Sequence, residues 1–408
     1  MALLITLILI FFQSNLYTKA IKVGSNHKVK TITAALLFAV NGDTLLIASG
    51  IYKEGPIAIR KSITIVGINN PIISGDGKYE IFLVEANNVK ITGLVFREAG
   101  LNYIKDNAAI KLNNVKNCVI SSNKFENNFF GIYLAKSQNC IIDGNIISAN
   151  HKKETQSGNG IHLWYCKNII IKNNTIRGHR DGIYMEFVRN SNIHNNFAEK
   201  NIRYGLHFMF SDSCSYSNNH FQINGAGAAV MYSHNVEMKN NRFEKNWGSA
   251  SYGLLLKDIY DSKISNNIFY KNSCGIYFEG CNRITFTKND LIENGWAVRL
   301  MSNSMENKFS ENNFISNSFD IATNSTKNYN YFDGNHWSEY KGYDLNKDGI
   351  GDVPFRPVKL FSFISERIRP SLILIRSLFI EIVNIAETVF PTFTPEALLD
   401  NNPKMKRI

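Results

Sequence analysis

Two methionines and one histidine in the middle of the chain carry donor atoms that suit Cu(I). His207 and Met209 are two residues apart, and Met231 follows Met209 by 22 residues. If residues 205–209 form a β-strand, the side chains of His207 and Met209 project from one face, about 6–7 Å apart. If the next turn of chain stacks residues 227–231 on this strand, Met231 lies about 4.8 Å from Met209. Imidazole and thioether groups at this spacing would bind Cu(I) without carboxylates.

Other interpretations of these residues stay open. Large side chains that only cover an exposed sheet would explain each of them taken alone. His162 is expected two turns below His207, roughly 10 Å away at strand spacing, so it could join copper binding only through a second site or a moving partner.

A second group of candidate ligands lies near the C-terminus and suits Ca²⁺. Oxygen-bearing side chains occupy positions 1, 3, 5 and 9 of a loop that has glycine at position 6, as in the first part of a calcium loop. Position 12 is Phe355 instead of glutamate, which excludes a complete EF-hand. A structural Ca²⁺ loop and a metal-free cluster of Asx turns both remain possible. The four candidate ligands are Asp344, Asn346, Asp348 and Asp352.

The copper candidates depend on a repeat that would stack one turn of chain on the next. A small residue precedes an apolar–X–apolar pattern at Gly131, Gly160, Gly182, Gly205, Gly227, Gly253, Gly275 and Ala297, with intervals of 29, 22, 23, 22, 26, 22 and 22 residues. Asparagines keep the same period at positions 123, 145, 174, 196, 219, 241, 267, 289 and 313. Short alternating strands with Asn/Gly turns at this period predict an all-β, right-handed parallel β-helix of roughly twelve turns.

The two long intervals predict loops beside the copper candidates. They fall at about residues 151–159 and 247–252, each just before a strand of the repeat. Insertions in a solenoid collect on one side, which is often the binding side. We therefore expect these loops to flank the site as walls.

The start of the chain predicts export. Residues 3–12 form an apolar run that is too short to span a bilayer, and Thr18-Lys19-Ala20 offers small residues for cleavage, so residues 1–20 are interpreted as a signal peptide. The net charge of +11 is spread along the chain without a basic block, which argues against a nucleic-acid partner. The six cysteines are expected to be small buried apolar residues.

The C-terminal part changes character after the repeat. We expect the β-helix over residues 21–335, the possible calcium segment over 336–357 and a helical segment over 358–408. Three alternatives stay open for these helices: they close the open end of the β-helix, they dock onto a partner such as one at a membrane, or they do both with different faces. The candidate docking residues are Phe361, Ile364, Ile368, Leu372 and Arg376.

An enzyme is the main alternative, because extracellular β-helices are often polysaccharide lyases, hydrolases or epimerases. Glycoside hydrolysis needs two carboxyl groups about 5–10 Å apart. On the expected outer face, Glu186 and Glu279 are four turns apart, roughly 19 Å, with no acidic residue at the outward positions between them. Asp181, beside His179 and Arg180, weakly resembles a pectin-cleaving motif, but it is a single carboxylate. The sequence therefore favours a protein that is not an enzyme.

Several motifs resemble the NosD family of periplasmic accessory proteins for nitrous oxide reductase maturation. The likeness runs from about residue 21 to 400 and is specific because the motifs occur in order. They are Gly160–Tyr165, Arg180–Met185, Arg203–Ser211, Val230–Ser233, Gly253–Asp258, Asn335–Trp337, Gly342–Asp344 and Phe355–Pro357.

The resemblance implies a non-catalytic periplasmic subunit of an ABC transporter, held at the inner membrane by the NosF ATPase and the NosY permease. It further implies that copper comes from the NosL chaperone and passes to apo nitrous oxide reductase, NosZ. Under this interpretation the outward His and Met residues are transient Cu(I) ligands, and residues 362–390 face the transporter.

Overall fold

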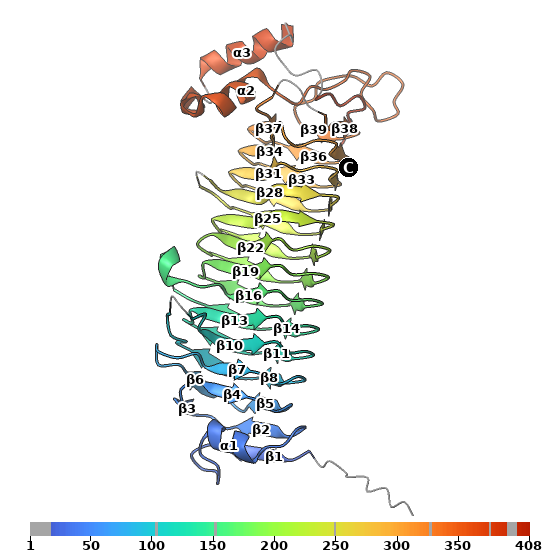
Figure 1. Cartoon of the computed structure of the whole chain (residues 1–408). Helices are drawn as coiled ribbons and strands as arrows, with labels where there is room; N and C mark the ends of the chain where they lie inside the picture. The colour runs from blue at the N-terminus through green and yellow to red at the C-terminus, as the bar shows by residue number, and fades with distance from the viewer. Residues whose placement is uncertain are drawn as a thin grey trace, which may run out of the picture.

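The computed structural model describes residues 18–102, 105–150, 153–248, 250–325, 329–374, 377–389 and 398–408. Most of the predicted signal peptide, residues 1–17, lies outside the described residues. The described chain is an elongated β-solenoid in which every strand pairing between turns is parallel (Figure 1). It rises from its N-terminal to its C-terminal end as a right-handed coil, which confirms the predicted fold class.

Three parallel sheets run along the solenoid, and each full turn visits them in the order C, A and B. Sheet C has 12 strands among the described residues: β4 (Ile57–Ile59), β7 (Phe82–Val84), β10 (Ala108–Asn113), β13 (Phe130–Ala135), β16 (Ile161–Trp164), β19 (Asp181–Glu186), β22 (Tyr204–Met209), β25 (Ala226–His234), β28 (Tyr252–Tyr260), β31 (Cys274–Glu279), β34 (Trp296–Leu300) and β37 (Phe319–Ala322).

Sheets A and B are built from shorter strands. The 14 described strands of sheet A are β1 (Ala20–Val23), β2 (Thr44–Ile47), β5 (Thr64–Gly67), β8 (Lys90–Thr92), β11 (Val119–Ser121), β14 (Ile141–Asp143), β17 (Ile170–Lys172), β20 (Asn192–His194), β23 (Ser215–Ser217), β26 (Glu237–Lys239), β29 (Lys263–Ser265), β32 (Thr285–Thr287), β35 (Lys308–Ser310) and β38 (Tyr331–Asp333). The 13 described strands of sheet B are β3 (Ile51–Tyr52), β6 (Ile72–Ser74), β9 (Val95–Arg97), β12 (Lys124–Glu126), β15 (Ile146–Ser148), β18 (Thr175–Arg177), β21 (Phe197–Glu199), β24 (His220–Gln222), β27 (Arg242–Glu244), β30 (Ile268–Tyr270), β33 (Asp290–Ile292), β36 (Asn313–Ile315) and β39 (His336–Trp337).

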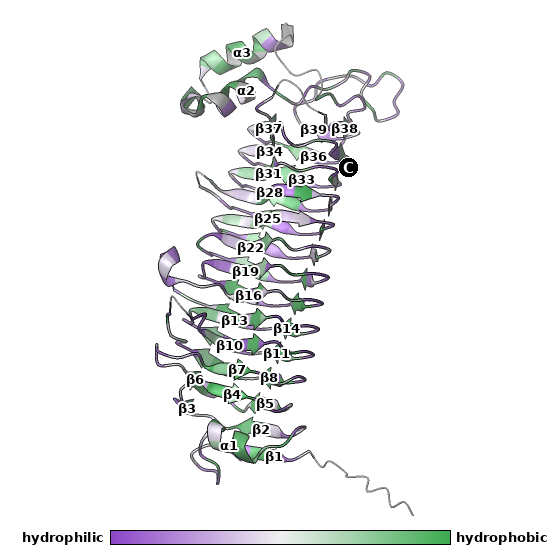
Figure 2. Ribbon diagram, in the orientation of Figure 1, coloured by the Kyte–Doolittle hydropathy of each residue, from purple (hydrophilic) through white to green (hydrophobic). Residues whose placement is uncertain are grey.

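The solenoid has about 13 turns, one more than the roughly twelve expected. The first turns lack the regular Gly and Asn landmarks, so their period is faint in the sequence. Alternate residues of each strand point into one continuous apolar core. In Figure 2 many strands carry hydrophobic colour and many turns carry hydrophilic colour.

An asparagine ladder runs along the solenoid at the corner between sheets A and B. The backbone N–H and the side-chain Nδ2 of Asn196 both donate to Oδ1 of Asn219, at 2.9 and 3.0 Å, and this pattern repeats from turn to turn. The preceding Asn195 has a left-handed φ of 56°, which asparagine tolerates well and which explains the Asn-Asn pairs in the sequence. At one turn the prediction was wrong: Asn312, not Asn313, is in the ladder, because Asn313 begins β36.

Helical segments cover both ends of the solenoid. Helix α1 (Ile32–Phe38) lies at the N-terminal end, and α2 (Leu360–Arg367), η2 (Arg369–Leu374) and α3 (Leu378–Val389) lie at the other (Figure 1). Residues 398–408 then return to the solenoid through bridges to β38 and β39. None of the described helices is long and apolar enough to cross a membrane.

Candidate functional site

The candidate copper ligands lie on the outer face of sheet C, about halfway along the solenoid (Figure 1). Strand register pairs Met209 of β22 directly with Met231 of β25. His207 lies between Tyr184 and Ala229 of the neighbouring strands, while Met209 lies between Glu186 and Met231. Both methionines are partly exposed. The fold thus brings one imidazole and two thioethers onto adjacent turns of the outer face.

His207 is buried although it is on the outer face, with only 3% of its surface exposed. Aromatic rings enclose it: the centroids of Tyr184 and Tyr204 lie 4.9 and 4.7 Å from the imidazole centroid. Nδ1 lies 3.4 Å from Oδ2 of Asp181, at the start of the neighbouring strand β19. Nε2 is buried and has no hydrogen-bond partner among the described residues. One imidazole nitrogen is therefore left to bind a ligand.

Tyr184 links the histidine to the first methionine. Its hydroxyl donates a weak hydrogen bond to Sδ of Met209, with an O–S distance of 3.7 Å. Burial raises the pKa of Tyr184 to about 12, and the negative charge of Glu186 contributes in the same direction. The tyrosine is therefore a neutral donor at physiological pH, and it contacts both the imidazole of His207 and the thioether of Met209.

His162 lies apart from this group, two strands away from His207. Its ring stacks on Tyr133 with centroids 4.4 Å apart, and its Nδ1 lies 3.0 Å from Nδ2 of Asn159. Burial lowers the pKa of His162 to about 3, with a further contribution from the positive charges of Arg180 and Lys111. The structure thus holds His162 as a neutral ring whose Nδ1 is already hydrogen-bonded.

The loop at residues 151–159 is only partly described, because residues 151 and 152 lie outside the described ranges. Its described part contains the short helix η1 (Glu154–Gln156) and supplies Asn159, the partner of His162. The second loop, at residues 247–252, precedes β28, and Ser249 is not described.

Two arginines accompany Asp181 at the edge of the site. Nε of Arg203 lies 3.6 Å from Oδ1 of Asp181, and Nε of Arg180 lies 3.9 Å from Oδ2. The arginines occupy adjacent turns, because the backbone N–H of Arg203 donates to the carbonyl of Arg180. The carboxylate is fully buried, and both arginine side chains are about one third exposed. The sequence did not predict that Asp181 would lie beside His207.

The described residues contain no group of three or more His, Cys, Asp or Glu side chains that could hold a metal ion. All six cysteines are buried free thiols, as expected. Burial raises the pKa of Cys166 to about 11 and that of Cys214 to about 12. The thiols of Cys166 and Cys214 are therefore protonated at physiological pH, and both lie in the apolar core, away from the outer face.

An aromatic stripe runs beside the methionines. It consists of Tyr165, Phe187, Phe210 and Tyr232, which follow the outward residues of β16, β19, β22 and β25. Their rings stack face to face along the solenoid, with centroids 4.5, 5.2 and 5.0 Å apart. Ring faces within the stripe therefore cover one another, and mainly ring edges face the solvent.

A family model described as periplasmic copper-binding protein, NosD, matches residues 38–156 and 151–342, most of the chain. The chain belongs to the NosD family. It is 26% identical to the probable ABC transporter binding protein NosD of Stutzerimonas stutzeri over 376 residues, which cover 86% of this chain and 85% of the relative. The same-named protein of Pseudomonas aeruginosa is 25% identical over 358 residues, 82% of each chain. The predicted family resemblance is confirmed.

Solved structures that resemble this NosD-family chain share only its fold. A family 28 exopolygalacturonase from Yersinia enterocolitica superposes with a TM-score of 0.59 and 13% identity, over 80% of this chain and 79% of the enzyme. The surface adhesin PfbA of Streptococcus pneumoniae gives 0.53 and 14%, over 78% and 91%. One neighbour is an enzyme and the other an adhesin, so the solenoid itself does not indicate an activity.

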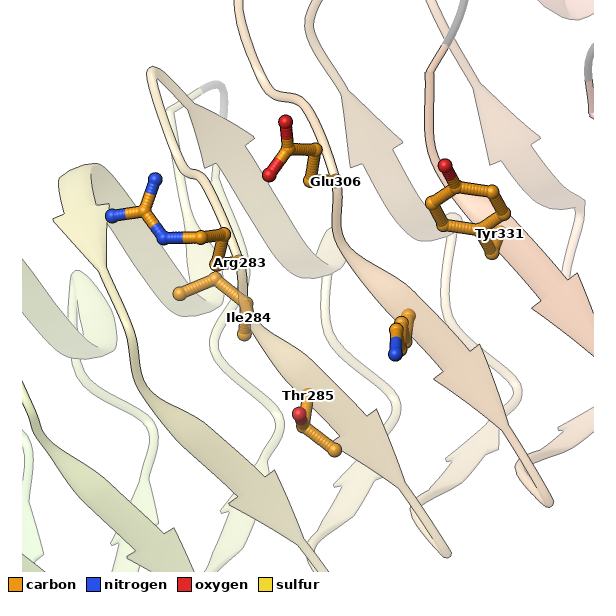
Figure 3. Close-up of a pocket in the computed structure, with 6 residues that line it drawn as sticks. Arg283, Ile284, Thr285, Glu306 and Tyr331 are labelled. Atoms are coloured by element: carbon orange, nitrogen blue, oxygen red, sulfur yellow. The ribbon is translucent and has the colours of Figure 1, made fainter.

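A pocket of about 780 Å³ lies on sheet A near the C-terminal end, away from the sheet that carries the copper candidates. Figure 3 shows Arg283 and Glu306 at successive turns, with Tyr331 one strand further on. Among the described residues that line the pocket, Glu306 carries a carboxylate, and Arg283 is paired with Asp261 at 2.6 Å.

The candidate docking residues of the C-terminal helices differ in exposure. We call α2, η2 and α3 together the cap. Phe361 is buried against Phe319, with ring centroids 5.9 Å apart, so it attaches α2 to the solenoid. Ile364 is partly buried, and Ile368 is exposed. The side chain of Leu372 and the whole of Arg376 lie outside what the structure describes. Helix α3 adds exposed apolar residues that lie within the expected docking range 362–390 but were not among the candidate residues: Leu378, Phe379, Ile382 and Ile385.

The candidate calcium ligands contact their own loop. Asp344 accepts hydrogen bonds from the backbone N–H groups of Asp348 and Gly349, and Asp352 accepts one from Leu345. Asn346 donates to Asp348 through its side-chain amide, at 3.0 Å. Hydrogen bonds of this kind occur in a metal-free cluster of Asx turns and in a calcium loop alike, so both alternatives stay predictions.

Proposed function

We propose that this NosD-family chain is a non-catalytic periplasmic subunit that passes Cu(I) through a site formed by His207, Met209 and Met231. The observation that carries the proposal is the buried Nε2 of His207, which has no partner among the described residues although two thioethers lie on the same face. The family description as copper-binding supports copper as the cargo.

The chemistry of this ligand set favours the reduced ion. A neutral imidazole and two thioethers are soft, uncharged donors, which suit Cu(I) better than harder divalent ions. Met209 and Met231 are partly exposed, so a partner protein can reach the metal from outside. Partial exposure of two of the three proposed ligands suits transfer to a partner better than permanent storage.

A titration with Cu(I) under reducing, anaerobic conditions tests the site. The wild-type chain should bind Cu(I) in competition with a chelator, and the double variant His207→Ala/Met209→Ala should bind at least tenfold more weakly. Met305→Ala is the matched control, because Met305 is an exposed methionine several turns away. Equal Cu(I) affinity in the wild-type chain and the double variant would disprove the assignment of these ligands.

We further propose that the cap docks onto the permease of an ABC transporter, NosY, which acts with the NosF ATPase and holds the chain at the inner membrane. The names of the relatives support a transporter. The exposed patch on α3 supports the location, because four large apolar residues on one short helix are unusual for a surface in water. Copper would arrive from the NosL chaperone and leave to apo nitrous oxide reductase, NosZ.

Charged substitutions test docking better than truncation, because residues 398–408 are part of the solenoid's end. The variant Phe379→Asp/Ile382→Asp should fold normally and lose co-purification with the permease and the ATPase. Ile146→Asp, which alters an exposed isoleucine in sheet B, should retain it. A complex that survives the double substitution would refute docking by α3.

The alternative function is a polysaccharide lyase, hydrolase or epimerase. The aromatic stripe offers mainly ring edges, whereas a sugar stacks on an open ring face. Asp181 is fully buried and faces two arginines and a histidine. We therefore favour a non-enzyme, and glycan cleavage that disappears in Asp181→Ala would reverse this preference.

A further inference from the structure

We infer that Asp181 is a positioning residue that fixes the tautomer of His207, so that Nε2 carries no proton and is free to take Cu(I). The part of the inference that concerns Cu(I) rests on the proposed function. The part that concerns the tautomer of His207 applies to the chain without copper.

The described residues offer the carboxylate of Asp181 one hydrogen-bond partner, which is His207. Oδ2 of Asp181 lies 3.4 Å from Nδ1 of the imidazole, and Oδ1 has no hydrogen-bond partner among the described residues. Both side chains are almost completely buried, at 0% exposure for the aspartate and 4% for the histidine. Water therefore has little access to compete for either group.

The two arginines balance the charge of Asp181 without using its hydrogen-bonding capacity. Their Nε atoms lie 3.6 and 3.9 Å from the carboxylate oxygens, farther than the 3.4 Å of the long imidazole–carboxylate hydrogen bond. At these distances the guanidinium groups still stabilise the buried negative charge. The carboxylate thus stays an acceptor directed at the imidazole.

An ionised carboxylate can only accept, so a hydrogen bond to it requires a proton on Nδ1 of His207. In a neutral imidazole the other nitrogen, Nε2, then carries the lone pair. The opposite tautomer would place the lone pair of Nδ1 against the carboxylate and an N–H at Nε2, where the described residues provide no acceptor. Carboxylate–histidine pairs that orient a metal ligand have this arrangement.

The tautomer can be measured on the wild-type chain without copper. Long-range ¹H–¹⁵N spectra at about pH 8, where an ordinary imidazole is neutral, distinguish the protonated from the bare ring nitrogen. The signals of His207 are identified by their absence in His207→Ala. We expect a proton on Nδ1 and none on Nε2, and a proton on Nε2 would overturn the inference whether or not the chain binds copper.

Substitution then tests the effect on the metal. In Asp181→Asn the amide can donate to Nδ1 and allow the opposite tautomer, so the spectrum should move the proton to Nε2 and Cu(I) affinity should fall about 10–100-fold. The matched control is Asp212→Asn, which alters another Asp–His pair, with His234 at 2.8 Å, on the exposed edge of a nearby turn. This control should leave both the His207 spectrum and the Cu(I) affinity unchanged.

The outcomes separate the two proposals. If Asp181→Asn has the wild-type melting temperature and the wild-type affinity for Cu(I), the positioning role of Asp181 is refuted. The proposed copper site would still stand. Absence of Cu(I) binding by the wild-type chain refutes the proposed function, while the wild-type spectrum still decides the tautomer. If Asp181→Asn does not fold, the wild-type spectrum alone decides.

Discussion

Arg299 of β34 and Glu366 of α2 form a double hydrogen-bonded ion pair, with N–O distances of 2.8 and 2.6 Å. The residues are 67 positions apart in sequence, and their side chains are only 15% and 5% exposed. Next to this pair, Ser362 donates to the carbonyl of Ile321 in β37, the last strand of sheet C. These contacts attach the helical cap to the end of the solenoid.

Glu366→Ala should loosen the cap. Removing one partner of a buried ion pair costs about 3–5 kcal/mol, because the other charge stays buried without compensation. Hydrogen–deuterium exchange should therefore become faster over residues 360–367. Arg283→Ala is the control: its pair with Asp261 has similar geometry but is about half exposed, so the cost should be below about 1 kcal/mol. Equal effects of the two substitutions would contradict this account.

His162 should make the chain sensitive to acid. The folded-state pKa of about 3 is below the ordinary value of 6.5, so the stabilisation is complete above about pH 6.5 and is lost as the pH falls toward 3. Between pH 7.5 and 4.5, the free energy of unfolding should fall about 2–3 kcal/mol more in the wild-type chain than in His162→Gln. Urea unfolding at both pH values measures the difference. His194→Gln, on the partly exposed face of sheet A, should leave the pH dependence as in the wild-type chain.

Asn241→Ala should destabilise the middle of the solenoid strongly. The substitution removes the acceptor for both the backbone N–H and the side-chain amide of Asn219, and it removes the donor to the carbonyl of Tyr216. Each unsatisfied buried group costs about 1–3 kcal/mol, so the sum should reach about 3–5 kcal/mol in urea unfolding. Asn192→Ala changes an exposed asparagine of β20 and should cost less than about 0.5 kcal/mol.

Removal of calcium should have little effect on the loop at residues 344–352. Its carboxylates already accept backbone hydrogen bonds, so a chelator should leave the melting temperature unchanged. Asp344→Ala removes two of these bonds and should speed proteolysis of the loop. A melting temperature that rises on addition of Ca²⁺ would instead support the calcium alternative.

The coil and its facing could be predicted because both depend on local pattern. Apolar residues at every second position place Ile161 and Leu163 inside, and the 22-residue period places Met231 opposite Met209. The two-residue alternation within a strand and the length of the repeat are enough to predict which side chains face inward and which pair between turns.

The surroundings of His207 could not be predicted in the same way. Asp181 lies 26 residues before His207 and begins the neighbouring strand β19, whereas His207 pairs with Tyr184 further along that strand. The contact between Asp181 and His207 therefore depends on the side-chain conformations of both residues. Burial of His207 comes from Tyr184 and Tyr204, whose rings could equally have faced the solvent. Similarly, the division of the cap into a buried Phe361 and an exposed α3 depends on tertiary packing.

The asparagine ladder has a direction, and this makes the two ends of the solenoid chemically different. Each hydrogen bond between two asparagines of the ladder is donated toward the C-terminal end, so the last asparagine, Asn335, needs an acceptor beyond the final turn. Asp400 of the returning tail provides it, taking the backbone N–H and the Nδ2 of Asn335 at 3.0 and 2.9 Å as another asparagine would. Whole repeats could therefore be inserted or deleted in the interior, whereas the terminal carboxylate acts as a stop that prevents further chains from adding to that end.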